Sequence, residues 1–318
     1  MESSLISIAI TTFVGVVILA LFVRSRKNAH DGGVVVITGG SAGIGLSYAK
    51  SVVKNYRPKR VVLIARNLEV LKRAQSELKS ISPSVPVVDV IQCDVADHSQ
   101  VDTIVEKISD VTVLVNCAGL SYPTELDLLS IAQIETMIRT NLLGSIYLTR
   151  RLIPYIKASS GPCKRIVFIS SQAGQVGLYG YTAYSATKFA LRGLAEALHM
   201  ELKPHNVAVC VAYPPDTKTE AFERENEIKP EATRRMSGDS PMDADDVGAI
   251  LARGIDSGNF SIWFNFDGFM LTQVTCGFSP PNGLWHLFYQ TFLVSIFRVV
   301  AVGYLAYFGM IARKYGRK

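Results

Sequence analysis

Tyr184 and Lys188, which stand four residues apart in the run Tyr-Ser-Ala-Thr-Lys, have the types and spacing best suited to chemistry. On a helix, side chains four positions apart lie on one face, so the phenol and the ammonium come close together. A phenol has an unperturbed pKa of about 10, and a nearby positive charge is expected to lower that pKa. Ser171, thirteen residues upstream, adds a hydroxyl that can donate to the same carbonyl oxygen. These residues are therefore predicted to exchange a proton with a ketone or an alcohol.

A glycine-rich turn upstream predicts a nucleotide site. The strand-like run 34–37 leads into Thr38-Gly39-Gly40-Ser41-Ala42-Gly43-Ile44-Gly45, and a helical pattern follows. Glycines permit a tight turn, and the free N–H groups of a helix N-terminus favour a pyrophosphate. The spacing Gly-x-x-x-Gly-x-Gly differs from the Gly-x-Gly-x-x-Gly of the standard dinucleotide fingerprint. The alternative is an ordinary strand-to-helix turn; the residues expected to contact a cofactor are Gly39, Ser41, Ala42, Gly43 and Gly45.

Arg66 predicts which dinucleotide binds. It ends the second strand-like run, twenty-one residues after Gly45. Enzymes that use NAD usually carry an acid there, which binds the adenine ribose diol. A guanidinium instead suits a 2′-phosphate, by bidentate contact or by stacking on adenine. We therefore expect NADPH as the cofactor; a solvated arginine in the strand-to-helix loop is the alternative.

Three polar residues mark later elements. Asp94 ends the third strand-like run and is predicted either to accept from the adenine amine or to cap the following turn. Asn116 ends the fourth run, before the small residues Cys117–Gly119, and can bond backbone groups of a neighbouring strand beside the cofactor. Asn141 interrupts a long helical stretch at a cost in helix propensity. We expect Asn141 to hold a water behind Lys188 in a proton relay.

The central part of the chain alternates apolar strand patterns with helical patterns. Near-continuous apolar strands separated by helices predict an α/β fold with a doubly wound parallel sheet of the Rossmann type. In such a fold, ligands collect at the carboxyl ends of the strands. The segment 216–242 is polar and proline-interrupted and is expected to be a mobile excursion near the site. Strands are predicted at 34–37, 61–65, 87–91, 111–115, 165–170, 207–212 and 260–264, and helices near 44–55, 67–80, 98–108, 130–157, 182–203 and 243–257.

The net charge of +6 over 318 residues comes from the two ends of the chain, which leaves the centre nearly neutral. Basic residues beside apolar segments indicate membrane topology and argue against a nucleic-acid surface. The five cysteines are scattered and lack Cys-x-x-Cys spacing, which argues against a disulfide framework and a zinc site. The basic residues at the ends are Arg24, Arg26, Lys27, Arg298, Arg313, Lys314, Arg317 and Lys318.

Both ends of the chain carry apolar segments. Residues 5–23 are uncharged and at 1.5 Å per residue span roughly 28 Å, close to a bilayer core. The basic flank after this run favours an uncleaved signal anchor with residues 24 onward in the cytosol; a cleaved signal peptide is the alternative. The apolar stretch 284–312 is interrupted by Arg298 and two other polar residues. It predicts membrane contact as a spanning, re-entrant or interfacial helix with Arg298 snorkelling, or else a soluble lid.

Taken in order, these motifs resemble the short-chain dehydrogenase/reductase family over about residues 32–260. The resemblance implies that Ser171 orients the carbonyl, that Tyr184 is the proton donor and that Lys188 lowers its pKa and bonds the nicotinamide ribose. The family spacing favours Ser171 over the adjacent Ser170. Homodimer formation is an expectation from the family alone. The resemblance rests on Thr38–Gly45, Asp94, Asn116–Gly119, Asn141, Ser171, Tyr184 and Lys188.

A closer resemblance within the family is to reductases of long-chain 3-keto amine lipids. It implies a sphingolipid-synthesis enzyme of the endoplasmic reticulum membrane whose active site faces the cytosol. A substrate amine calls for an acidic partner, and Asp216, Glu220 and Glu223 are candidates. We expect a signal anchor over 1–27, a catalytic domain over 28–270 and a membrane-associated segment over 271–318. The segments that carry this resemblance are Ser170–Tyr184, Leu194–Leu198, Ala212–Thr217 and Asp267–Leu271.

Two other functions fit the same residues. A membrane-bound hydroxysteroid or retinol dehydrogenase would keep the chemistry and change the lipid. A catalytically silent nucleotide-binding scaffold is the third hypothesis, against which Ser171, Tyr184, Lys188 and Asn141 all argue.

Overall fold

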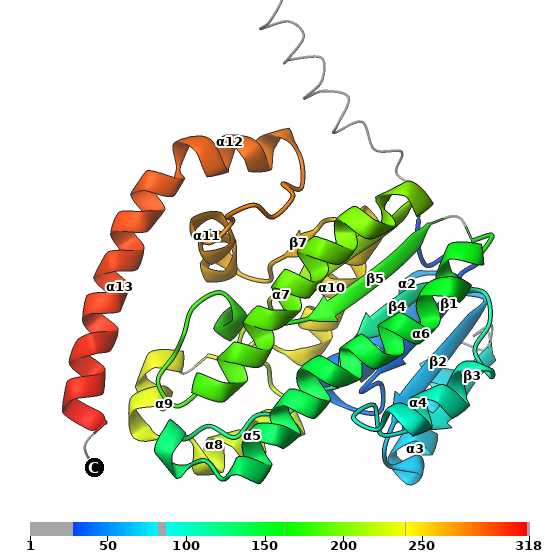
Figure 1. Cartoon of the computed structure of the whole chain (residues 1–318), viewed down its shortest axis with the longest axis horizontal. Coiled ribbons are helices and arrows are strands. Elements are labelled where there is room, and N and C mark those ends of the chain that lie inside the picture. The colour runs from blue at the N-terminus through cyan, green and yellow to red at the C-terminus, as the bar shows by residue number, and fades with distance from the viewer. Residues whose placement is uncertain (1–27, 82–86, 162, 239, 317–318) are drawn as a thin grey trace, which may run out of the picture.

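Seven parallel strands form one sheet with helices on both faces (Figure 1). The computed structural model describes residues 28–81, 87–161, 163–238 and 240–316. The strand order is β3-β2-β1-β4-β5-β6-β7, and each neighbouring pair is parallel. This arrangement confirms the predicted doubly wound fold. The signal anchor predicted at residues 5–23 lies outside the described residues.

The strands are short and apolar, and the central ones are buried on both faces. In β1, Val34 and Val36 enter one core layer while Val35 and Ile37 enter the other. This alternation explains why the run is continuously apolar, as expected for a parallel sheet covered on both sides. The bounds are β1 Val34–Thr38, β2 Arg60–Ala65, β3 Val87–Gln92, β4 Val111–Asn116, β5 Lys164–Ile169, β6 Val207–Ala212 and β7 Ser261–Ile262.

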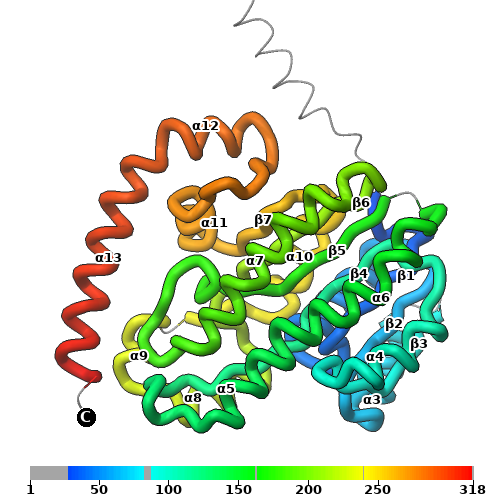
Figure 2. The backbone as a smooth tube through the Cα atoms, in the orientation of Figure 1, coloured from blue at the N-terminus to red at the C-terminus, as the bar shows by residue number. Residues whose placement is uncertain are grey.

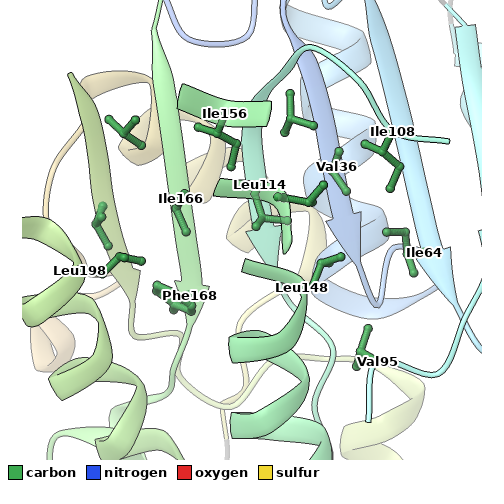
Figure 3. Packing of buried hydrophobic residues seen from close by; sticks show 14 of the residues in the cluster. Val36, Ile64, Val95, Ile108, Leu114, Leu148, Ile156, Ile166, Phe168 and Leu198 are labelled. Atoms are coloured by element: carbon green, nitrogen blue, oxygen red, sulfur yellow. The ribbon is translucent and has the colours of Figure 1, made fainter. Parts of the chain in front are cut away.

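Three helices cover each face of the sheet. Leu148 from α6 and Leu198 from α7 belong to the same buried cluster as Leu114, Ile166 and Phe168 of the sheet (Figure 3). Each large apolar side chain buried in this way contributes about 1.5–3 kcal/mol, so the two layers hold the strand ends in place. One face carries α4 (His98–Val105), α6 (Gly144–Ala158) and α7 (Thr182–Leu202), and the other carries α2 (Gly43–Asn55), α3 (Leu68–Ile81) and α10 (Ala244–Ser257).

The helix predicted over 130–157 is divided into three parts. Ser130 begins α5 (Ile131–Met137) with a capping box, in which its hydroxyl accepts from the Gln133 N–H at 3.2 Å. A π-helical segment, Ile138–Leu143, then separates α5 from α6 and contains the buried Asn141. The π-helical segment is where the sequence showed an interruption, and such segments are frequent at functional sites.

The segment 216–242, predicted to be a mobile excursion near the site, contains regular secondary structure. It forms two short helices, α8 (Glu220–Ile228) and α9 (Glu231–Ser237). The Thr219 hydroxyl caps α8 by accepting from the Phe222 N–H at 3.1 Å, which gives the polar segment a helical start. These helices lie beside the carboxyl ends of the strands (Figure 1).

The C-terminal segment forms an arm along one side of the molecule (Figure 2). The arm consists of α12 (Leu284–Phe292) and α13 (Val294–Tyr315) and follows α11 (Phe266–Val274). Phe297 packs edge-on against Phe269 at a ring distance of 6.0 Å, and Tyr315 stacks 4.1 Å from the Arg235 guanidinium of α9. Among the described residues, α13 is the one helix long and apolar enough to cross a membrane.

Candidate active site

A cavity of about 1380 Å³ lies at the carboxyl ends of the strands. The strand order switches between β1 and β4, because β2 and β3 lie on one side of β1 and β4 to β7 lie on the other. Ligands of open α/β sheets bind at such a switch point. The turn after β1 and the loop after β4 both line the cavity, as do α8, α11 and α13. The cavity therefore joins the predicted nucleotide turn to the C-terminal arm.

The glycine turn has a backbone that a side chain would disrupt. Gly39 has φ of +64°, and a Cβ on it would lie 3.0 Å from the Ala118 Cα. A Cβ on Gly45 would lie 2.4 Å from the Gly39 carbonyl oxygen, which is a clash with backbone. Helix α2 begins at Gly43, and its N-cap residue Ala42 makes no side-chain cap bond, so N–H groups there remain for a ligand. Of the predicted contacts, Gly39, Ser41, Ala42, Gly43 and Gly45 all line the cavity.

Arg66 and Asp94 also line the cavity, whereas Asn116 lies beneath it. Arg66 is exposed at the end of β2, and within the described chain its guanidinium makes no ion pair. Asp94 accepts from the Ala96 N–H at 3.0 Å, so it forms the turn that was the alternative to adenine binding. Asn116 donates to Thr149 at 3.0 Å and to the Val167 carbonyl of neighbouring β5 at 3.4 Å. Its contacts are therefore with the protein scaffold behind the cavity.

Tyr184 and Ser171 face each other in the cavity. Tyr184 lies in the first turn of α7, and its hydroxyl is hydrogen-bonded to the Ser171 side chain. Ser171 follows β5 and also accepts from the Ala173 N–H at 3.1 Å, which holds it in place. The neighbouring Ser170 is buried and donates to the Lys188 carbonyl at 2.9 Å, so its hydroxyl ties α7 to β5. Ser171 is therefore the serine that can hold a substrate oxygen together with Tyr184.

Lys188 is buried one helical turn after Tyr184. Its ammonium donates to the Ile169 carbonyl at 2.8 Å and lies 5.6 Å from the centre of the Tyr184 ring. Asn141 exchanges two 2.9 Å bonds with the backbone of Leu120, and its amide also donates to Thr187. A Cβ on Gly119 would lie 3.3 Å from Lys188 Nζ and 3.4 Å from Asn141 Oδ1. The ammonium and the amide oxygen thus border one small space that a glycine keeps open.

The protonation of this group differs from the sequence prediction. Lys188 was expected to lower the pKa of Tyr184, but burial raises that pKa, the charge of Glu225 adds to the rise, and the Ser171 hydrogen bond offsets part of it. Burial also lowers the pKa of Lys188 to about 8. Removal from water disfavours the charged form of each group, so the phenol is harder to deprotonate and the ammonium is easier to deprotonate. Tyr184 therefore stays protonated at neutral pH, which is the form that a proton donor requires.

An acidic wall, formed by Asp216 and Glu225, lies on the α8 side of the cavity. Asp216 pairs at 3.2 Å with Lys229, whose side chain is only 1% exposed. Glu225 accepts from the Tyr181 hydroxyl at 3.1 Å. Of the predicted amine partners, Asp216 and Glu220 line the cavity, and Glu220 already pairs with Arg224 at 2.8 Å.

Glu225 was not among the residues singled out from the sequence. It stands four residues before Lys229, the spacing of one helical face, and this was the signal available. Because the segment 216–242 was expected to be a mobile excursion, the helical spacing of Glu225 and Lys229 was not interpreted. Glu223, which was singled out, is exposed and does not line the cavity.

Helix α13 completes the cavity with one of its faces. The residues on that face recur at helical spacing and belong to the cavity wall. Arg298, expected to snorkel toward a membrane surface, is part of this wall. The opposite face is apolar and exposed, with Val299 73% exposed. The cavity-facing residues are Arg298, Ala301, Tyr304, Leu305 and Phe308, and the outward-facing ones are Ile296, Val299, Val300, Tyr307 and Met310.

The chain matches a family model described as short chain dehydrogenase over residues 33–230. It is 42% identical over 291 residues to a 3-dehydrosphinganine reductase of Danio rerio, covering 89% of this chain and 86% of that protein. It is 41% identical over 299 residues to a 3-ketodihydrosphingosine reductase of Bos taurus, covering 92% and 89%.

Solved structures show the same fold. A short-chain dehydrogenase from Sphingobium yanoikuyae in complex with NADPH has a TM-score of 0.64 at 24% identity, over 73% of this chain and 87% of that chain. A levodione reductase has a TM-score of 0.67 at 18% identity, over 76% and 99%. At these identities the likeness extends to the arrangement of the strands and helices.

Proposed function

Because this chain belongs to the short-chain dehydrogenase/reductase family, we propose that it reduces 3-ketodihydrosphingosine to dihydrosphingosine with NADPH. The observation that carries the proposal is an identity of 40–42% to three reductases of this name or its synonym over about nine tenths of the chain. The site supports it, since Ser171, Tyr184 and Lys188 meet in a cavity that reaches an apolar arm.

The cavity residues fit NADPH. The glycine turn would hold the pyrophosphate, since Gly39 and Gly45 leave no room for a side chain and the α2 N-terminus offers N–H groups. Arg66 would hold the 2′-phosphate, and this assignment is supported by its exposure and lack of an ion pair in the described chain. When bound, NADPH supplies the hydride for the substrate carbonyl.

The chain's own residues handle the proton and the oxygen. Ser171 and Tyr184 both donate to the carbonyl oxygen at C3, which stabilises the negative charge that develops there. Tyr184 then gives its proton to that oxygen. Lys188 has a pKa of about 8, so at pH 7 its charged form is roughly ten times as abundant as its neutral form. The charged form supplies positive charge beside the phenol. Asn141 and Lys188 flank the space where a bridging water would return a proton to Tyr184.

We further propose that the outward-facing residues of α13 contact a bilayer. They are apolar and exposed, and the opposite face of the same helix lines the cavity. A long-chain lipid partitions into the bilayer, so this arrangement places the cavity at the substrate's source. With the predicted signal anchor over 1–27, we infer attachment to the endoplasmic reticulum membrane with the catalytic domain facing the cytosol. Homodimer formation stays a prediction.

The test is NADPH consumption by the detergent-solubilised protein with 3-ketodihydrosphingosine, a steroid ketone and retinal as separate substrates. We expect turnover of the first, and Tyr184→Phe should lower kcat by about 10²–10⁴-fold. Tyr155→Phe, on α6 away from the cavity, is the matched control. Turnover of a steroid or retinoid alone would favour the hydroxysteroid or retinol dehydrogenase. NADPH consumption that Tyr184→Phe abolishes would exclude a catalytically silent scaffold.

A further inference from the structure

We propose that Glu225 is the specificity-determining residue that binds the ammonium group of the substrate. This inference rests on the proposed function, because 3-ketodihydrosphingosine carries an amine on the carbon next to the reacting carbonyl. The amine nitrogen must then lie close to the oxygen held by Ser171 and Tyr184. A group that binds it has to border the cavity beside those two side chains.

The geometry places Glu225 beside the reacting group. Glu225 lines the same cavity as Tyr184 and Ser171. Its carboxylate accepts from the Tyr181 hydroxyl at 3.1 Å, and the Tyr181 ring lies 5.4 Å from the Tyr184 ring. Burial has the largest effect on the pKa of Tyr184 and of Lys188, and the negative charge of Glu225 raises both pKa values.

The charges of this wall leave one carboxylate without a close cation. Lys229 pairs with Asp216 at 3.2 Å and is enclosed by the rings of Phe222, at 4.6 Å, and Tyr181, at 5.9 Å. In the described part of the chain, Glu225 has no lysine or arginine nitrogen within 4.0 Å. The wall of Asp216, Glu225 and Lys229 therefore carries a net negative charge. An arriving ammonium would neutralise that charge.

Burial makes an ammonium ligand more favourable at Glu225 than at an exposed acid. Burial raises the pKa of Glu225, so its ionised form is destabilised until a cation arrives. Asp216 is already paired, and Glu220 is bound to Arg224. Glu225 is thus the acid of this wall that has no paired cation in the described part of the chain.

A second polar side chain lies at the same place. Ser121 lines the cavity next to Glu225, and hydrogen bonding from its hydroxyl lowers the pKa of that carboxyl against the larger effect of burial. The carboxylate therefore has a hydroxyl beside it. The substrate's terminal hydroxyl is on the carbon next to the amine, which matches a hydroxyl partner beside a carboxylate.

The experiment compares two substrates and two variants near neutral pH. The substrates are 3-ketodihydrosphingosine and its analogue with a hydroxyl in place of the amine. Glu225→Gln keeps the shape and an acceptor for Tyr181 but removes the charge. Glu227→Gln, an exposed acid of the same helix that does not line the cavity, is the control. Binding of the amine product dihydrosphingosine to each protein is measured in parallel by calorimetry.

We expect Glu225→Gln to raise KM for the amino ketone and Kd for dihydrosphingosine by about 10- to 100-fold. Values for the hydroxyl analogue should stay within about threefold, and Glu227→Gln should match the wild type. If the variant fails to fold, the wild type alone decides, since it should prefer the amino ketone by at least about tenfold. A wild type that treats both substrates alike, or a Glu225→Gln variant with unchanged amine binding, would overturn the role of Glu225 and leave the proposed function standing. A wild type inactive on 3-ketodihydrosphingosine would overturn both.

Discussion

Replacing Arg66 should weaken the preference for NADPH over NADH. The size of this change is limited because Arg66 is exposed to solvent. Arg66 lines the cavity at the end of β2, where its guanidinium makes no ion pair in the described chain. A 2′-phosphate carries nearly two negative charges, and a hydrogen bond to a charged group contributes about 1.5–3 kcal/mol. Because Arg66 is exposed, solvent screening favours the lower value, which corresponds to roughly a tenfold change in affinity.

We therefore expect Arg66→Ala to raise KM for NADPH about tenfold and to leave KM for NADH nearly unchanged. Arg66→Asp should shift the ratio of kcat/KM values further toward NADH, by about 100-fold in total, since it repels the phosphate and can accept from the ribose diol. Arg57→Ala is the matched control, because Arg57 is also exposed but precedes β2 at the far end of the strand. A ratio that moves less than about threefold in both Arg66 variants would refute the assignment of the 2′-phosphate.

Three further predictions test the pH dependence, the glycine turn and the arm. The kcat/KM should fall as pH rises through about 8, where Lys188 loses its proton, and a profile flat to pH 10 would contradict that role. Gly45→Ala should weaken NADPH binding at least about 100-fold by calorimetry, because its Cβ would lie 2.4 Å from the Gly39 carbonyl oxygen, whereas Gly193→Ala, with open space around it, should bind normally. Val299→Asp with Met310→Glu should reduce co-flotation with liposomes several-fold relative to Glu227→Gln, since each charge is placed on the exposed apolar face of α13; unchanged flotation would show that this face does not contact lipid.

The sheet could be predicted closely because its signals are local. The run expected at 34–37 is β1 over Val34–Thr38, and the run expected at 207–212 is β6 with the same bounds. A continuous apolar run between turn residues leaves little freedom in where a buried parallel strand begins. The last strand was predicted at 260–264 but covers only Ser261–Ile262, the two residues that pair with β6.

The acidic wall could not be predicted because it depends on tertiary packing. The segment 216–242 is polar along its length, which indicates a loop when it is considered alone. Folding buries Lys229 against Phe222 and Tyr181 and brings Glu225 to the catalytic pair. The spacing of Glu225 and Lys229 indicates one helical face, but nothing in the sequence places that face beside the catalytic pair. The same limit applies to Tyr184, whose pKa depends on a burial that a helix pair does not reveal.

Burial of Tyr184 and Lys188 favours the protonation states that a reduction uses. A raised pKa keeps Tyr184 protonated, and the pKa of about 8 at Lys188 keeps most of the ammonium charged near neutral pH. Tyr184 is then ready to give a proton to an alkoxide, whereas oxidation would need the phenol to lose its proton first. The negative charge at Glu225 strengthens this bias because it raises the pKa of Tyr184. A substrate ammonium at Glu225 would reduce that effect as it binds, so amine recognition and proton donation are coupled through one carboxylate.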